Sequence, residues 1–178
     1  TYHCQTNLIT HNGKAYGDYC KNRCCSICNA IRKAKLIHTY KPSIETWSDP
    51  HFLTLTVKAQ PKTNLENWIN GMVKAMSLIL NRCRKRYLRG KGIKLIGIKS
   101  LECNFNPKKK TYNPHFHILC ASKDIAETIK REWLELWNRD YKRTGLKRHR
   151  YALTYLQNIR KVNCTEEDLI ETIKYGAK

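Results

Sequence analysis

The chain has 178 residues, of which 41% are hydrophobic, and its 34 Lys and Arg against 14 Asp and Glu give a formal net charge of +20. This length supports one hydrophobic core with a small appended segment. No apolar run approaches the roughly 18 residues of a membrane span and no secretory signal opens the chain, so we expect a cytoplasmic protein without a membrane partner. The positive charge favours nucleic acid as the partner.

Residues 1–45 are predicted to be a separate, cysteine-rich zinc-binding segment, because they hold five of the nine cysteines and little hydrophobic periodicity. Cys20, Cys25 and Cys28 have the C-x4-C-x2-C spacing of a zinc knuckle, and Cys4 is the best fourth thiolate. The competing fourth ligands are Cys24, His3 and His11. A structural Zn²⁺ ion would stabilise this segment, which is too poor in apolar residues to form a core.

Residues 46–178 show a regular order of elements after a turn-rich joint at 41–50. Alternating apolar residues predict strands at 51–57, 93–106, 112–122 and 151–162. Helical spacing predicts helices at 64–89, 123–143 and 165–178, with Asn64 and Thr165 as N-caps. The order β-α-β-β-α-β predicts an α+β fold, a ferredoxin-like split βαβ antiparallel sheet with helices on one face, followed by one more helix.

The stretch "NPHFHIL" at 113–119 sets two histidines on one face of a strand, because residues i and i+2 point the same way. A turn centred near residues 109–110 would place Glu102 opposite His117 and Asn104 opposite His115. The other face would carry the apolar residues Leu101, Cys103, Phe105, Phe116, Ile118 and Cys120. The polar face is therefore expected to stay open while the apolar face packs on helices.

This polar face has the composition of a divalent-metal site. His115, His117 and Glu102 offer two nitrogen ligands and one oxygen ligand, with coordination positions left for an anionic substrate. Thr54 and Thr56 alternate away from the apolar residues of the first strand, so they are expected to line the same face. Mn²⁺ or Mg²⁺ suits the hard oxygen chemistry, while imidazoles also accept Zn²⁺ or Co²⁺.

The last predicted helix carries a second set of reactive groups. Glu171, Tyr175 and Lys178 lie at i, i+4 and i+7 on one stripe, nearly opposite the apolar stripe. A phenol on a polar stripe can act as a nucleophile toward a phosphodiester, and a carboxylate one turn earlier can act as a base. Lys178 can compensate the phosphate charge.

The motifs "FLTLTV", "PHFHIL" and "ETIKYGAK", in this order, resemble those of the rolling-circle plasmid replication initiators, which are HUH endonucleases with one catalytic tyrosine. The early "CKNRCCSIC" and the aromatic "WLELW" are also similar to counterparts in that family, so the resemblance covers nearly the whole chain. Since the chain ends three residues after Tyr175, we expect it to be a trimmed domain.

The resemblance implies a site-specific nick in single-stranded DNA at an origin hairpin, with a host helicase and polymerase as further partners. By motif position, Tyr175 is the nucleophile that stays attached to the 5′ end, and Lys178 is its accompanying cation. Glu171 falls where this branch of the family has a carboxylate that activates water. His115, His117 and Glu102 fall at the positions of the metal ligands, and Cys4, Cys20, Cys25 and Cys28 correspond to a cysteine cluster common at the start of these proteins.

Three alternatives remain at this point. A single-tyrosine transposase or a relaxase would use the same chemistry on other DNA. Two histidines and one carboxylate also describe non-haem iron oxygenases and zinc hydrolases, although neither class requires Tyr175 or the positive charge. A non-catalytic zinc-containing nucleic-acid-binding protein of the RRM type would present stacking aromatic residues on the sheet, where this chain has polar ones.

Overall fold

The computed structural model describes residues 4, 8–17, 19–22, 25–138 and 151–162. The predicted helix at 165–178, with Glu171, Tyr175 and Lys178, lies outside these residues, as do His3 and Cys24. Within the part of the chain that is described, none of the helices has the length and apolar character needed to cross a membrane.

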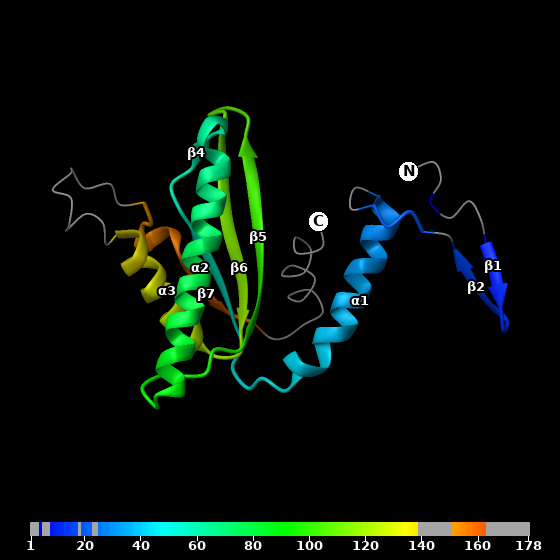
Figure 1. Cartoon of the computed structure of the whole chain (residues 1–178), viewed down its shortest axis with the longest axis horizontal. Helices are drawn as coiled ribbons and strands as arrows, with labels where there is room; N and C mark the ends of the chain where they lie inside the picture. Colours follow the sequence, from blue (N-terminus) through cyan, green and yellow to red (C-terminus); the bar gives the residue numbers. More distant parts are fainter. Residues whose placement is uncertain (1–3, 5–7, 18, 23–24, 139–150, 163–178) are drawn as a thin grey trace.

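An antiparallel sheet forms the centre of the described structure (Figure 1). Its long strands pair in the order β5 (Gly97–Asn106), β6 (Thr111–Cys120), β3 (His51–Thr56) and β7 (Asn158–Lys161). The short β4 (Gln60–Pro61) pairs with the start of β6. Helix α2 (Leu65–Leu88), preceded by a 3-10 turn at Lys62–Asn64, connects the first strands to β5, and α3 (Lys123–Asn138) follows β6. The predicted α+β class and antiparallel sheet are confirmed.

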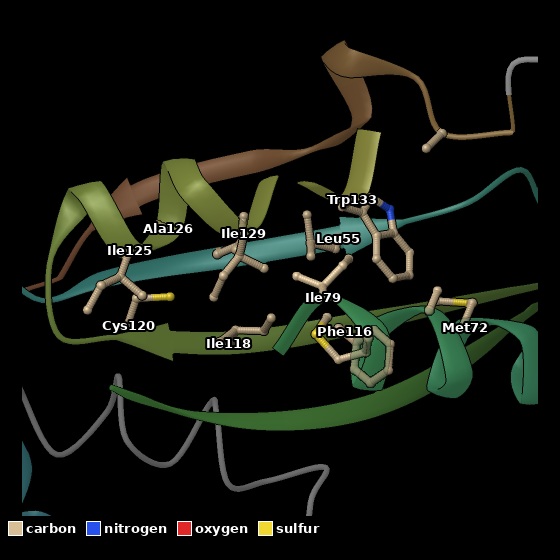
Figure 2. Close-up of a cluster of buried hydrophobic side chains, with 14 of the residues drawn as sticks. Leu55, Met72, Ile79, Phe116, Ile118, Cys120, Ile125, Ala126, Ile129 and Trp133 are labelled. Atoms are coloured by element: carbon tan, nitrogen blue, oxygen red, sulfur yellow. The ribbon is translucent and has the colours of Figure 1, made fainter. Parts of the chain in front are cut away.

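The main hydrophobic core lies between one face of the sheet and helices α2 and α3 (Figure 2). The strand residues that face it are Leu53, Leu55, Val57, Phe116, Ile118 and Cys120. The helices contribute residues at three- and four-residue spacing, among them Met72, Met76, Ile79, Cys83, Ile125, Ile129 and Trp133. Trp133 is fully buried and meets the Phe116 ring edge-on at 5.9 Å. These helices cover the apolar face of the sheet, and the two histidines lie on the opposite face.

Among the described residues, a smaller core covers one end of the histidine face. Ile44, near the end of helix α1 (Ser26–Glu45), packs there with Phe52, Leu119 and Val162. Helix α1 was not predicted from the sequence, and the expected turn-rich joint at 41–50 was wrong for 41–45, which form the last turn of α1. The N-terminal hairpin of β1 (Leu8–His11) and β2 (Lys14–Gly17) was also not predicted.

Two predicted strands are shorter in the structure. The expected strand at 93–106 begins only at Gly97, because Gly97 pairs with Cys120, where its partner strand β6 ends. The expected strand at 151–162 pairs with β3 only over Asn158–Lys161, after a 3-10 turn at Thr154–Leu156. The reason for the second difference is Gln157, whose side-chain Oε1 accepts the Thr56 backbone N–H at 2.8 Å. The Gln157 side chain thus takes the place of the next backbone hydrogen bond between β3 and β7.

We predict that Gln157→Leu lowers the free energy of unfolding by about 2 to 3 kcal/mol, because it leaves the buried Thr56 N–H without its acceptor. Urea unfolding followed by circular dichroism measures this change. Tyr155→Ala in the same segment is the control: its side chain is 80% exposed, so the change should stay within about 0.5 kcal/mol. Equal effects of the two substitutions would contradict the proposed role of Gln157.

Candidate metal centre on the open face of the sheet

Three ligand-type side chains meet on the histidine face. The Oε2 atom of Glu102 lies 3.3 Å from Nε2 of His115 and 3.2 Å from Nε2 of His117. The side chains of the three residues are only 8 to 13% exposed. The structure therefore brings together the three residues that the sequence predicted, one from β5 and two from β6, and we call this group the triad.

The register of the hairpin differs from the predicted one by two residues. Glu102 pairs with His115, Ser100 with His117 and Asn104 with Asn113, whereas Glu102 was expected opposite His117 and Asn104 opposite His115. The turn is centred one residue earlier than predicted, because Oδ1 of Asn106 accepts the backbone N–H of Lys109 at 3.1 Å and closes the loop there. A shift of two residues keeps every side chain on its face, so the triad still forms.

Hydrogen bonds to the sheet orient both imidazoles. Nδ1 of His115 lies 2.9 Å from the backbone carbonyl of Asn113. A carbonyl only accepts, so Nδ1 carries the proton and the lone pair of Nε2 points toward Glu102. Nδ1 of His117 lies 3.4 Å from the hydroxyl of Thr54, its direct partner on β3. Both rings therefore present Nε2 to the same point in space.

The threonines of β3 share this face, as predicted. Thr54 pairs with His117 and Thr56 with His115. The Thr56 hydroxyl donates to Oδ1 of Asn113 at 2.9 Å, and its carbonyl accepts from Nε1 of Trp133 at 3.2 Å. These hydrogen bonds to Asn113 and Trp133 therefore hold strand β3 in place beside the histidines.

The geometry fits a divalent cation with six ligands. Neighbouring ligand atoms of an octahedral Mg²⁺ or Mn²⁺ site lie about 3.0 Å apart when the bonds are about 2.1 Å long. The two distances from Glu102 Oε2 are close to this value, and all three ligand atoms lie within 4.8 Å of one another. Three protein ligands leave positions for water or a phosphate oxygen.

Sequence reasoning missed two contributors to this face. The backbone carbonyl of Asn113 sets the His115 tautomer, and no sequence signal could have shown it, because every residue has a carbonyl. Arg160 on β7 lies over the Phe52 ring at 4.7 Å, and that ring lies 5.2 Å from His117. The alternation of Asn158 and Arg160 along β7 was the available signal for this cation.

A second cluster of ligand-type residues forms at the start of α1. The thiols of Cys4, Cys20, Cys25 and Cys28 all lie within 4.8 Å of one another, and the Sγ atom of Cys28 lies 3.4 Å from that of Cys4 and 3.6 Å from that of Cys20. Tetrahedral zinc with bonds of about 2.3 Å places its sulfurs about 3.8 Å apart, so the spacing fits.

The electrostatics of this cluster are those of thiols that compete for ionisation. The backbone N–H of Cys28, in the first turn of α1, lowers the pKa of the Cys25 thiol to about 6. Burial and the neighbouring thiols of Cys4 and Cys20 raise the pKa of Cys28 to about 12. Because adjacent thiolates repel one another, the four can ionise together only around a cation.

The chain is similar to known replication proteins. The model of the Rep_1 family, described as "Replication protein", matches residues 13–178. A "Protein rep" from Staphylococcus aureus is 36% identical over 172 residues, which cover 89% of this chain and 69% of that relative. Proteins of the same name from Streptococcus pneumoniae serotype 2 and Bacillus amyloliquefaciens are 26% and 31% identical, each over 70% of this chain but only 41% and 38% of the relative. No solved structure matches.

We predict that His117→Ala weakens the binding of Mn²⁺ by at least about 100-fold, because it removes one of three converging ligands. Isothermal titration calorimetry on the full chain measures the affinity. His38→Ala is the matched control, because His38 is exposed on α1 and belongs to neither cluster. Mn²⁺ binding that His117→Ala leaves unchanged would mean that the triad holds no metal.

We predict one tightly bound Zn²⁺ per chain, lost in Cys25→Ser and retained in Cys103→Ser, whose thiol is exposed on β5. Metal analysis after mild chelation measures the content. Folded protein without zinc would refute this prediction. Zinc that persists in Cys4→Ser would instead assign the fourth ligand to Cys24, His3 or His11.

Proposed function

Because the chain belongs to the Rep_1 family of replication proteins, we propose that it nicks single-stranded DNA at a plasmid replication origin to start, and later end, rolling-circle replication. The observation that carries the proposal is the convergence of His115, His117 and Glu102 on the face of the sheet opposite helices α2 and α3. Such a site suits a phosphodiester substrate, and the charge of +20 suits DNA.

In the proposed reaction, the phenolic oxygen of Tyr175 attacks the scissile phosphorus. The new bond links Tyr175 to the 5′ phosphate, the bond from phosphorus to the 3′ oxygen breaks, and that oxygen takes a proton and leaves as a 3′-OH. Lys178 offsets the charge of the phosphate. Both residues lie outside the described structure, so their roles rest on the resemblance of "ETIKYGAK" to the family motif.

The triad provides the cation site for this reaction. Glu102, His115 and His117 would hold Mn²⁺ or Mg²⁺, which would supply Lewis acidity toward a phosphate oxygen when bound. The protein's own contribution is orientation: the Asn113 carbonyl and the Thr54 hydroxyl hold the rings so that Nε2 of each faces Glu102. Because these contacts exist before DNA binds, little reorganisation is needed during the reaction.

We also propose that two segments of the chain have different roles. Residues 46–178 form the HUH endonuclease domain with a ferredoxin-like split βαβ arrangement, which the strand order β5-β6-β3-β7 supports. Residues 1–45 form the segment that a structural Zn²⁺ ion holds together through Cys4, Cys20, Cys25 and Cys28. A host polymerase would extend the 3′-OH in the cytoplasm, and a host helicase would unwind the duplex ahead of it.

Other functions of the same site have less support. A transposase or relaxase shares the chemistry, but the family match and the relatives named "Protein rep" favour a replication origin as the substrate. Iron oxygenase or zinc hydrolase activity would not explain the net charge of +20. A purely nucleic-acid-binding function would not explain the convergence of the triad.

We predict that Tyr175→Phe binds origin single-stranded DNA but forms no covalent adduct, because the nucleophilic oxygen is gone. The measurement is an SDS-resistant band that carries the label of a 3′-labelled oligonucleotide in the presence of Mn²⁺, with EDTA as the metal control. Tyr155→Phe is the matched control, because Tyr155 is exposed in the described structure. Undiminished adduct in Tyr175→Phe would assign the nucleophile to another tyrosine.

The same assay separates initiation from termination. Glu171→Ala should still form the adduct through Tyr175 but lose most hydrolysis of a second origin strand, because no base takes the proton from the attacking water. If both steps fall equally, Glu171 assists Tyr175 itself. If neither changes, Glu171 only forms a surface ion pair, which is worth about 0.3 kcal/mol.

A further inference from the structure

The end of helix α2 folds back on itself in a way that gathers positive charge. The Lys91 N–H donates to the Arg86 carbonyl at 3.0 Å, and the Gly90 N–H donates to the Tyr87 carbonyl at 2.9 Å. With Gly90 at a φ of +68°, this is a Schellman turn. The chain then passes so close to α2 that a Cβ on Gly92 would lie 3.2 Å from the Arg86 Cβ. The turn therefore holds Lys91 beside Arg86.

A cavity of about 180 Å³ lies at this turn. Cations from three segments line it: Arg86 from α2, Lys91 from the turn and Arg131 from α3. Its other lining residues are Cys83, Gly92, Ile93 and Thr128. No acidic side chain lines the cavity among the described residues, and Thr128 adds a hydroxyl that can donate a hydrogen bond.

The charges in the cavity do not cancel. Arg86 donates to the buried carboxylate of Glu132 at 2.6 Å, so its charge is balanced and its position is fixed. Lys91 and Arg131 are exposed, and the neighbouring carboxylate of Glu127 lies 3.7 Å from the ammonium of Lys123. Two positive charges therefore face a cavity with a hydroxyl, which is the chemistry of a phosphate site.

The surroundings of the cavity extend the charge. Residues 82–94, "RCRKRYLRGKGIK", contain seven Lys or Arg and no acid. Basic side chains at a helix C-terminus also offset the helix dipole, but that role is local to the last turn of α2 and does not require Arg131 of another helix. The convergence of α2, the turn and α3 on one cavity needs a different explanation.

We propose that this cavity binds a backbone phosphate of duplex DNA, as a second DNA contact on the helix side of the sheet. It lies across the sheet from the triad, because α2 and α3 cover the opposite face. Single strands are usually held by basic grooves with stacking aromatic rings, and none lines this cavity among the described residues. Duplex DNA is positioned by Lys and Arg contacts to phosphates. The proposal rests on the proposed function, since it assigns the duplex next to the nicked strand to this surface.

The test compares three variants that each lose one positive charge: Lys91→Ala and Arg131→Ala in the cavity, and Lys74→Ala, exposed on the same helix α2 but outside the cavity. Affinities of the full chain are measured by fluorescence anisotropy for a labelled hairpin duplex and for a single strand of equal length, at several salt concentrations. Thermal melting checks that each variant is folded.

Each cavity variant should bind the duplex about tenfold more weakly than Lys74→Ala, with little difference on the single strand. The salt slope of the duplex affinity should also fall by about 0.9 in the cavity variants, as for one lost phosphate contact. Equal duplex affinity in all three variants overturns the proposal. An equal loss on the single strand overturns the duplex assignment.

Thr128→Val, which removes the cavity hydroxyl and no charge, should also weaken duplex binding relative to Lys74→Ala and provides a second reading if one charge variant unfolds. The assay measures binding alone, so its outcome is separate from the nicking reaction. Nicking that fails in the wild-type chain would refute the proposed function and leave the duplex result standing.

Discussion

The pairing of Glu102 with His115 across the β5–β6 hairpin is the contact on which the candidate site depends. A slip of one residue would move Glu102 to the core face, whereas a slip of two would keep it on the histidine face but move it by about 6.6 Å, opposite His117 or Asn113 instead of His115. Two local features fix the register at opposite ends of the hairpin. Asn106 closes the turn through its bond to the Lys109 N–H. At the other end, a Cβ on Gly97 would lie 2.7 Å from the Leu119 carbonyl, so only glycine allows the strands to approach this closely there.

The second constraint is the way the core supports Thr56, the partner of His115 on β3. Its carbonyl accepts from Nε1 of Trp133 and Nε2 of Gln157, and its backbone N–H donates to Oε1 of Gln157. Its hydroxyl donates to Asn113, whose own carbonyl orients His115. Helix α3, the segment before β7 and both central strands therefore meet at one residue. A hydrogen-bonded junction of this kind transmits the rigidity of the packed core to the face that carries the triad.

The sequence was sufficient to predict the face on which the triad lies, but not the register of the hairpin or helix α1. Each outcome has a physical reason. The face on which His115 and Glu102 lie follows from the period of two along a strand, which survives an error of two residues in register. The register itself depends on a side-chain bond in the turn, which no periodicity encodes. Helix α1 escaped prediction because, of its described residues, only Cys28 and Ile44 are buried, and because Pro42 lies inside it. Its amphipathic pattern is therefore too weak to distinguish it from a loop.

Among the described residues, no Lys or Arg forms an ion pair with Glu102, which is informative in a chain with a net charge of +20. Several other carboxylates of the described residues pair with cationic side chains, among them Glu132 with Arg86, Asp49 with Lys161 and Glu45 with Lys41. The ion-pair contacts of Glu102 within the described residues are with the two imidazoles. A lysine or arginine in that position would neutralise the carboxylate and occupy the place where a metal ion would bind. Affinity for a polyanion can come from cations spread over the surface, whereas a metal ligand must stay available. A Glu102 that has no Lys or Arg ion pair among the described residues makes both possible in one small domain.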